Sequence, residues 1–443
     1  MFRSIASTML MVWILACSSF AYAGLTRTDQ LVVDGIKVQR SNVAALSSNM
    51  FVSASKEDNG KLRLTVWKIS SDGKLNKKDT YTAGEVKELD VAVIPSNGPD
   101  RQFVTALRDA SNELRLITWR VTSSGDHISR LDTWANSSVK IGQVKLTQWH
   151  GANDLAAVAL TSGEKQLVVW AFEISSTGEI KYLLRLRYTN KLSGGLSANN
   201  RVVGFRDPAG RVRLTNFAYK TPSTGDPIGL EVYRGDTLLG SKSDGFDGIE
   251  GAGDGAHHVY SLSIAPGTTA VKQGVLCNQR LIVGHGRATL TVWKAPRNWN
   301  EPLEKGEGST TTTSGKILDR PFLSYVGIAK SVKLLALHQV QDGTDEFVTA
   351  HSGFGTWCAR KKKDRGREKV YLHLWSDKSG PTSGHSNTID VIGKAEIGGR
   401  YAQIDMAQLI DYSDLNSTRF VVALRGKDSK LYLSVWIASG LLD

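Results

Sequence analysis

A basic segment near residue 360 holds the most concentrated set of anion-binding side chains in this chain. It contains one indole and six cationic residues: Trp357, Arg360, Lys361, Lys362, Lys363, Arg365 and Arg367. Guanidinium groups bind carboxylate, sulfate or phosphate through paired hydrogen bonds, ammonium groups act as point charges, and an indole stacks on a sugar or a base. The segment is therefore predicted to bind an anionic ligand. The alternative is a long, solvated hairpin tip.

A glycine-rich acidic segment lies earlier in the chain. Its four carboxylates belong to Asp244, Asp247, Glu250 and Asp254. Calcium takes about six to eight oxygen ligands in a flexible loop, so Ca²⁺ is the one cofactor that these residues suggest. The spacing is not that of an EF-hand. The alternatives are an ordinary acidic loop and a loop that pairs with the basic segment.

Two histidines, His285 and His351, each follow a small residue at what reads as the same position of a repeat. Together with His257 or His258 they suggest a shared metal or acid–base site, as a metal-assisted hydrolase or polysaccharide lyase would need. Buried neutral histidines explain the pattern equally well. The sequence contains no catalytic serine elbow, phosphate-binding loop or zinc motif, which favours a non-catalytic protein over an enzyme.

A repeated two-strand unit must position these residues. Each unit has a strand with a small residue, followed in most cases thirteen positions later by an aromatic residue. The small residues are Ala54, Ala106, Ala159, Gly204, Gly284, Ala350 and Ala423, and the aromatic residues are Trp67, Trp119, Phe172, Phe217, Trp293, Trp375 and Trp436. The spacing is nine in the fifth unit and twenty-five in the sixth. Apolar residues at period two precede each aromatic residue, which indicates strands.

Seven such units predict an all-β fold, a seven-bladed β-propeller of four-stranded blades that fills residues 24–443 as a single domain. The last unit ends near the C-terminus without an outer strand. Within residues 24–34, the segment from Leu25 to Leu31 resembles the segment from Ile128 to Trp134, which is expected in an outer strand. We therefore expect the N-terminal strand to complete the last blade and close the ring, which also removes exposed sheet edges.

The unit resembles the WD-repeat blade, in which a small-residue strand precedes a strand that ends in Trp. The resemblance implies propeller architecture. It departs from that family after the aromatic residue, where Asp is never found; the residues there are Lys68, Arg120, Glu173, Ala218, Lys294, Ser376 and Ile437. The Gly-His pair of the family is also missing. The resemblance therefore does not extend to WD-repeat ancestry or to an intracellular scaffold role.

Extra sequence is concentrated at residues 220–257, 297–330 and 353–368. Second-to-third and fourth-to-first connections of four-stranded blades share one face. We expect the insertions to crowd that face over blades four to six and to form the binding surface. Cys277 is expected in a first-to-second turn and Cys358 in a second-to-third connection. Because these two connections lie on opposite faces of a propeller, the cysteines are expected to be too far apart for a disulfide, and both thiols are expected to be unpaired.

Residues 1–23 read as an export signal, with Arg3, an apolar stretch from Met9 to Ala16 and a small-residue end at Ala23. A lipid anchor at Cys17 is the alternative. No later stretch is apolar enough to span a bilayer. The net charge of +12 favours anionic partners, and export disfavours nucleic acid. The sequence thus predicts a secreted or periplasmic, non-catalytic binding protein for an anionic glycan or a partner protein.

Overall fold

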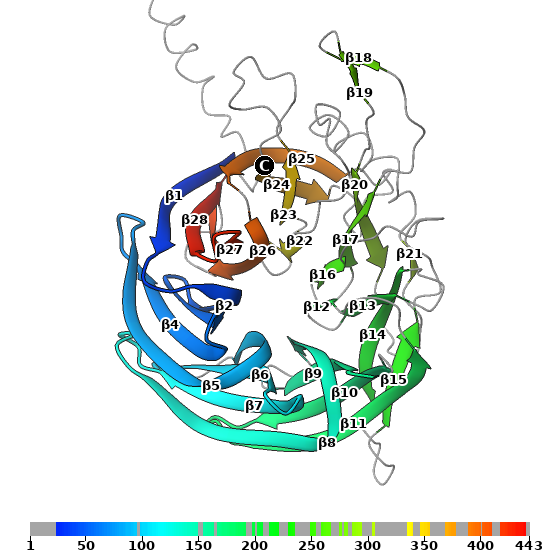
Figure 1. Cartoon of the computed structure of the whole chain (residues 1–443). Helices are drawn as coiled ribbons and strands as arrows, with labels where there is room; N and C mark the ends of the chain where they lie inside the picture. The colour runs from blue at the N-terminus through cyan, green and yellow to red at the C-terminus, as the bar shows by residue number, and fades with distance from the viewer. Residues whose placement is uncertain are drawn as a thin grey trace, which may run out of the picture.

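The computed structural model describes the N-terminal third and the C-terminal end of the chain almost continuously, and mainly strands between them. The described ranges are 24–94, 98–148, 154–163, 166–191, 197–199, 202–206, 212–220, 229–234, 249–253, 258–266, 274–276, 279–281, 286–294, 304–305, 335–339, 346–354, 368–377, 389–399, 401–409 and 417–439. Their regular structure is entirely β-strand, paired antiparallel (Figure 1). The predicted all-β class is confirmed, whereas residues 1–23 lie outside the described ranges.

The strands pair with their neighbours along the chain in units of four. The first three units are formed by β2 (Val38–Ser47), β3 (Met50–Glu57), β4 (Lys61–Ile69), β5 (Leu75–Ile94), β6 (Arg101–Asp109), β7 (Glu113–Val121), β8 (Ile128–Gln148), β9 (Asp154–Thr161), β10 (Gln166–Ile174) and β11 (Ile180–Lys191). The long strands β5 and β8 each serve two units. The first half of β5 pairs with β4 and its second half with β6, and β8 joins β7 to β9 in the same way.

The fourth to sixth units follow the same order. The fourth consists of β12 (Ser197–Asn199), β13 (Val202–Arg206), β14 (Val212–Lys220) and β15 (Gly229–Arg234). The fifth consists of β16 (Ile249–Gly253), β17 (His258–Pro266), β20 (Gly286–Lys294) and β21 (Glu304–Lys305), and the sixth of β22 (Leu335–Gln339), β23 (Glu346–Phe354), β24 (Glu368–Asp377) and β25 (Ile389–Gly398). A separate hairpin, β18 (Gly274–Leu276) with β19 (Gln279–Leu281), lies between β17 and β20 in the chain.

The seventh unit joins the two ends of the chain. It contains β26 (Tyr401–Leu409), β27 (Ser417–Gly426), β28 (Leu431–Ser439) and, as its fourth strand, β1 (Gly24–Val33). The register of β1 with β28 runs from Gly24 opposite Ser439 to Val33 opposite Leu431. The expected pairing of the N-terminal strand with the last repeat is therefore present.

The repeated aromatic residue anchors the third strand of a unit in the core. Trp67 and Trp119 are buried and lie opposite Phe51 and Phe103 of the preceding strand. Each indole N–H has an acceptor: Trp67 Nε1 donates to the Ser53 hydroxyl at 2.9 Å, and Trp119 Nε1 donates to Thr105 in the same way. These bonds satisfy buried donors that would otherwise oppose folding.

Each hydrophobic core cluster in the described residues lies between neighbouring units. One cluster combines Phe51 and Trp67 of the first unit with Leu409 and Val435 of the seventh. Others join the first unit to the second, the second to the third, and the sixth to the seventh. Apolar burial between the faces of adjacent sheets thus holds neighbouring units together.

The strand pairing of the fifth unit differs from the pairing that the sequence repeat predicts. Its second strand is β17, which pairs with β20 so that Val259 lies opposite Trp293. The segment around Gly284, read from the sequence as that strand, follows β19 instead. Leu262 therefore occupies the place of the small residue. In the third unit a longer turn between β9 and β10 shifts the register by one, so Val158 occupies that place rather than Ala159.

An aspartate on the fourth strand repeatedly bridges to the next unit. Asp29 accepts a hydrogen bond from the Leu75 N–H at 2.7 Å, Asp79 from Ile128 at 2.7 Å and Asp132 from Ile180 at 2.8 Å. These three aspartates lie just after a β-bulge in β1, β5 and β8. The bulge redirects the strand and aims the carboxylate at the neighbouring unit.

The first strands of successive units contact one another around a common centre (Figure 1). β2 contacts β5, β5 contacts β8, and contacts continue from β8 to β12, β16, β22 and β26. β26 in turn contacts β2. The fourth strands, such as β1 and β8, lie on the outside of this arrangement (Figure 1).

Candidate binding site

Two kinds of connection leave the sheets at the same end, which we call the loop end. They are the turns from the second to the third strand of a unit and the connections from the fourth strand to the next unit. Backbone bonds link them: the Val86 N–H donates to the Gly60 carbonyl at 2.8 Å, and Ile141 donates to Asn112 at the same distance. Both acceptor residues have positive φ, 82° and 63°. This conformation turns their carbonyls toward the neighbouring unit.

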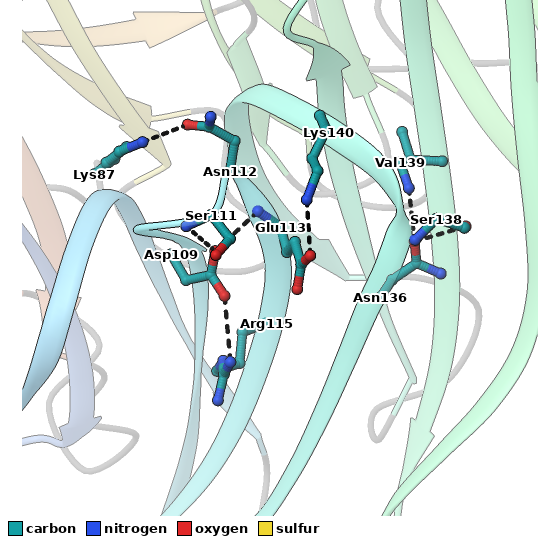
Figure 2. A network of polar contacts seen from close by, with 10 residues as sticks. All are labelled: Lys87, Asp109, Ser111, Asn112, Glu113, Arg115, Asn136, Ser138, Val139 and Lys140. Carbon is teal, nitrogen blue, oxygen red and sulfur yellow. Dashed lines mark hydrogen bonds and ion pairs between the residues drawn. The ribbon is translucent and has the colours of Figure 1, made fainter.

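The loop end of the second unit is closed by its own polar contacts (Figure 2). Asp109 accepts hydrogen bonds from the backbone N–H groups of Ser111 and Glu113, both at 2.9 Å, and pairs with Arg115 at 3.2 Å. Lys140 of the following connection pairs with Glu113 at 2.8 Å. In the first unit, Glu57 forms an equivalent ion pair with Arg63. Because these charges neutralise one another, we infer that the turns of both units are structural and do not bind a ligand.

The long connections of the fourth to sixth units also belong to the loop end. Between their strands lie residues 235–248, 267–285, 306–334 and 355–367, with the β18–β19 hairpin inside the second of these. The corresponding second-to-third turns of the first and second units span only 58–60 and 110–112. The segment 267–285 was not recognised from the sequence, because the fifth unit was read in the wrong register.

The predicted basic site lies outside the described residues. Trp357, Arg360, Lys361, Lys362, Lys363, Arg365 and Arg367 all fall in 355–367, between β23 and β24. The pairing of these two strands places Phe354 opposite Glu368. The segment therefore connects the second and third strands of the sixth unit, as the sequence indicated.

The predicted acidic site is divided. Glu250 lies within β16, opposite Leu262 of β17, rather than in a loop. Asp244, Asp247 and Asp254 lie outside the described residues. Binding of Ca²⁺ by these four residues thus stays a prediction, with Glu250 fixed in a strand.

The two histidines do not share a repeat position. His351 lies in β23, between Leu335 of β22 and Tyr371 of β24. The residue at the same register in the fifth unit is Ser263, because β17 is the second strand there. His285 falls outside the described residues, just before β20. The premise of a paired histidine site is therefore wrong.

The expected placement of the cysteines also changes. Cys277 falls between β18 and β19, within the second-to-third connection of the fifth unit. Cys358 falls in the same kind of connection of the sixth unit. Both residues lie outside the described ranges, but the assignment of their connections to opposite ends was wrong. The prediction of unpaired thiols loses its topological basis.

A row of polar side chains on the first strands was not recognised from the sequence. We call it the inner polar row; its described side chains are Asn42, Asp90, Lys145 and Asp405, each opposite the residue at the small-residue place of its unit. Ser197, Glu250 and Ala336 hold the same register in the fourth to sixth units. The residue type changes from unit to unit, so no motif reveals the row, and only the strand register does.

The inner polar row links neighbouring units by hydrogen bonds. Asp405 accepts from the Val43 N–H at 2.7 Å, and Asp90 accepts from the Leu146 N–H at 2.8 Å. Asn42 Nδ2 donates to the other oxygen of Asp90 at 3.1 Å. Asn42 and Asp90 are 2% and 7% exposed. The acids thereby satisfy backbone donors on first strands, which have no further strand to pair with on that side.

Asp405 is the titratable member of this row near neutral pH. Burial raises the pKa of Asp405 to about 6, and the negative charge of Asp90 acts in the same direction. The positive charge of Lys145 and the hydrogen bond from Val43 lower the pKa but do not offset burial. A carboxyl group with this pKa exchanges its proton in mildly acidic solution.

Among the described residues, no group of three or more His, Cys, Asp or Glu side chains is arranged to hold a metal ion. Within the same residues, no helix has the length and apolarity needed to cross a membrane.

Comparisons with known proteins find only distant structural similarity. No protein-family model and no curated protein matches the sequence. Among solved structures, the chain is similar to the WD40 domain of SCAP from fission yeast, with a TM-score of 0.39 and 10% sequence identity. The similarity covers 95% of this chain and 98% of that chain. A likeness this distant carries no information about ligand or partner.

Proposed function

We propose that this chain is an exported, non-catalytic, seven-bladed β-propeller that binds an anionic glycan at the loop end of its fourth to sixth units. In this proposal the seven four-stranded units are the blades of one closed ring. Support for closure comes from both sides of the junction between the last and first units: β1 pairs with β28, and β26 contacts β2. The Val38 N–H also donates to the Ser429 carbonyl at 2.7 Å.

The placement of the binding surface in this proposal depends on one observation. The connections 235–248, 267–285, 306–334 and 355–367 all leave the loop end of adjacent units, whereas the first and second units have short, charge-paired turns there. Long connections on a rigid scaffold are where binding residues concentrate. A propeller presents such connections together, because neighbouring units point the same end in the same direction.

The charge of the chain supports an anionic ligand. The net charge is +12, and the segment 355–367 contains six Lys or Arg residues against one Asp. Clustered cations raise the rate at which a polyanion meets the protein and bind its acidic groups directly. Export, supported by the sequence of residues 1–23, makes an acidic polysaccharide more accessible to the protein than nucleic acid.

The strand register removes the argument for a metal-assisted hydrolase or lyase. That argument required His285 and His351 to share one repeat position. The strand pairing instead gives Ser263 of β17 the register position in the fifth unit that His351 has in the sixth. A partner protein, by contrast, is an outcome that the following experiment distinguishes.

The test is a binding titration of residues 24–443 with heparin and with polygalacturonate at several salt concentrations. Replacing Lys361, Lys362 and Lys363 by Gln is expected to weaken binding about tenfold, since each exposed ion pair contributes a few tenths of a kcal/mol to about 1 kcal/mol. The control variant replaces three exposed lysines in or near the outer strands of the first and third units, Lys74, Lys77 and Lys181, by Gln.

The control carries the same change in net charge and is expected to alter the affinity much less. Equal losses in the two variants would mean that binding follows net charge alone. Absence of binding to either polyanion would contradict the glycan proposal and favour a partner protein.

A further inference from the structure

Three neighbouring units carry a cation at one register of the second strand, next to the loop end. It is the last residue but one of the strand in each case: Lys56 of β3, Arg108 of β6 and Arg425 of β27. Each lies two positions after the small residue of its unit, so its side chain is on the same face of the sheet as that residue. We call these three residues the loop-end cation row.

The other units show that the fold does not need a cation at this register. Leu160 holds the place in the third unit, Ile264 in the fifth and Ser352 in the sixth. The fourth unit has Arg206 there, but the third unit separates it from the row. Because Leu160 is buried at this place, an apolar side chain satisfies the packing. The positive charge of the row therefore needs another explanation.

The row is not neutralised within the part of the chain that the structure describes. None of its three side chains forms a hydrogen bond or an ion pair with a described residue, and the buried Nε atoms of Arg108 and Arg425 have no acceptor. Arg40 and Arg115 also have a buried Nε without an acceptor, but both pair with a carboxylate through a terminal nitrogen. Among the described arginines, Arg108 and Arg425 thus combine an unsatisfied buried donor with an uncompensated charge.

The acids next to the row are already engaged by other side chains. In the first and second units, the acid that directly follows the row cation pairs with an arginine of the third strand. These pairs are Glu57 with Arg63 and, at 3.2 Å, Asp109 with Arg115 (Figure 2). In the seventh unit, Asp428 accepts a hydrogen bond from the Tyr432 hydroxyl at 2.8 Å. All three row cations are only partly exposed, so they are unneutralised charges held partly out of water.

The row continues the basic segment 355–367 onto the neighbouring units. That segment belongs to the sixth unit, whereas Arg425, Lys56 and Arg108 belong to the seventh, first and second. These four units are consecutive, because core clusters join the sixth to the seventh, the seventh to the first and the first to the second. Their second strands lie next to the first strands, which surround the centre of the molecule (Figure 1). The cations thus follow one another along the loop end.

We propose that Arg425, Lys56 and Arg108 bind successive acidic groups of one glycan chain. This inference rests on the proposed function and specifies its ligand: a linear glycan with repeated carboxylate or sulfate groups that extends from the sixth unit to the second. Each guanidinium binds such a group through two parallel hydrogen bonds, and the lysine acts as a point charge. Solvent screens these contacts less than fully exposed ones, because the cations are partly buried. Contacts on several units reinforce one another in a single long ligand.

The surroundings of the row favour a glycan over single-stranded nucleic acid. Proteins that bind single strands stack successive bases on aromatic side chains. The residues directly opposite the row are not aromatic: they are Arg40, Glu88 and Gln403 on the first strands, and Leu62, Leu114 and Leu431 on the third. A stronger preference for nucleic acid is therefore an outcome that would overturn the proposal.

Calorimetric titration of residues 24–443 with a heparin dodecasaccharide tests the proposal. The row variant carries Arg108→Leu and Arg425→Leu, which removes two charges and gives both units the residue type that the third unit has in Leu160. Its affinity is expected to fall about tenfold, a loss equal to about one charge-assisted hydrogen bond. A second variant, Arg108→Lys with Arg425→Lys, keeps both charges and is expected to stay within about threefold of the wild type. Circular dichroism checks that both variants are folded.

The matched control carries Arg120→Leu and Arg419→Leu. These two arginines lie on the same units as Arg108 and Arg425 but at the other end of the sheets, and they too are partly exposed. The control is expected to change the affinity less than about twofold, because its charges do not touch the ligand. Equal losses in the control and the row variant, unchanged affinity in the row variant, or tighter binding of an oligothymidylate of equal charge would each overturn the proposal.

The same titration separates this inference from the loop-end proposal. Weaker binding when Lys361, Lys362 and Lys363 are replaced by Gln, together with normal binding by the row variant, would uphold the basic segment and exclude the row. No binding of the dodecasaccharide by the wild type would contradict the loop-end proposal itself, and the role of the row would be lost with it. Losses in both variants are the expected result.

Discussion

Acidic side chains near the centre of the molecule join one unit to the next. Asp405 and Asp90 occupy the same register on β26 and β5, and each accepts a hydrogen bond from the backbone of the following unit. Asp405 is special because it connects the C-terminal unit to the N-terminal one. It also carries the raised pKa, about 6, so its protonation state couples pH to the junction where the chain ends meet.

We predict that Asp405 contributes a pH dependence to stability. Its folded-state pKa of about 6 is above the ordinary value of 3.8, so the folded protein binds the proton more tightly than the unfolded chain. This contribution is fully present below about pH 4 and is lost as the pH rises through about 6. Urea unfolding of the wild type and of Asp405→Asn at pH 4 to 7 measures it.

The difference in unfolding free energy between the two proteins is expected to change by up to about 3 kcal/mol across this range, in the direction that favours the wild type at low pH. Asp90→Asn is a useful comparison at the same register on another unit. A constant difference from pH 4 to 7 would show that Asp405 ionises normally in the folded protein.

At the residue scale, little of the candidate site was predictable. The basic segment was recognised because cations are adjacent in the sequence, and its connection was assigned correctly. The inner polar row was not recognised, because Asn42, Asp90, Lys145 and Asp405 share a place in space but not a residue type. Tyr182 was not singled out, since its stacking against Trp134 joins two units and is not visible in the sequence.

Among the structural elements, the bulged outer strands carry the contacts that lock neighbouring units. Asp132 satisfies the N–H groups of Thr133 at 2.7 Å and Ile180 at 2.8 Å. We predict that Asp132→Ala lowers the free energy of unfolding by about 1–3 kcal/mol, because two partly buried backbone donors lose their acceptor. Denaturant unfolding of residues 24–443 provides the measurement.

The control for this variant is Asp126→Ala, which also removes a carboxylate from the second unit. Asp126 is exposed and pairs only across the surface, with Lys78 at 3.3 Å. Its loss is expected to lower the free energy of unfolding much less than the loss of Asp132, because solvent screens an exposed ion pair. Equal effects of the two substitutions would argue that the Asp132 bridge does not stabilise the boundary between units.

The tight turns from the third to the fourth strand impose a second requirement. Gly178 has φ of 90°, and a side chain there would collide with Leu131 of the preceding unit. We predict that Gly178→Ala destabilises the protein by about 1–3 kcal/mol, from backbone strain and from displacement of Leu131. Gly163→Ala is the control, because a methyl group there meets no atom within 4 Å. Similar melting temperatures for the two variants would contradict the prediction.

At the element scale, the repeat was readable wherever the turn between the second and third strands is short. Ala54 and Trp67, or Ala106 and Trp119, keep the expected spacing and register. In the fifth unit Leu262 replaces the small residue, and the β18–β19 hairpin separates β17 from β20. Gly284, a small residue that comes shortly before Trp293, fits the sequence pattern although it is not part of the second strand. The pairing of β17 with β20 joins residues on both sides of the inserted segment, so the spacing of residues along the sequence does not reveal it.

On the scale of the whole molecule, the two chain ends stabilise the same unit. β1 supplies the fourth strand beside β28, and Asp29 on β1 bonds to the first unit through Leu75. We predict that a chain starting at residue 35 loses cooperative unfolding of the seventh unit, because the edge of β28 becomes unpaired. Hydrogen exchange of residues 431–439 is expected to accelerate strongly relative to the 24–443 protein. Unchanged protection there would show that β1 is dispensable.

Hydrogen exchange of the 24–443 protein with and without a heparin oligosaccharide tests directly whether the loop end binds an anionic glycan. We expect slower exchange in the long loop-end connections of the fifth and sixth units, above all in 355–367. The short turns at 58–60 and 110–112 are expected to exchange at the same rate in both samples. Protection confined to those short turns, or to the opposite end of the sheets, would contradict the proposed binding face.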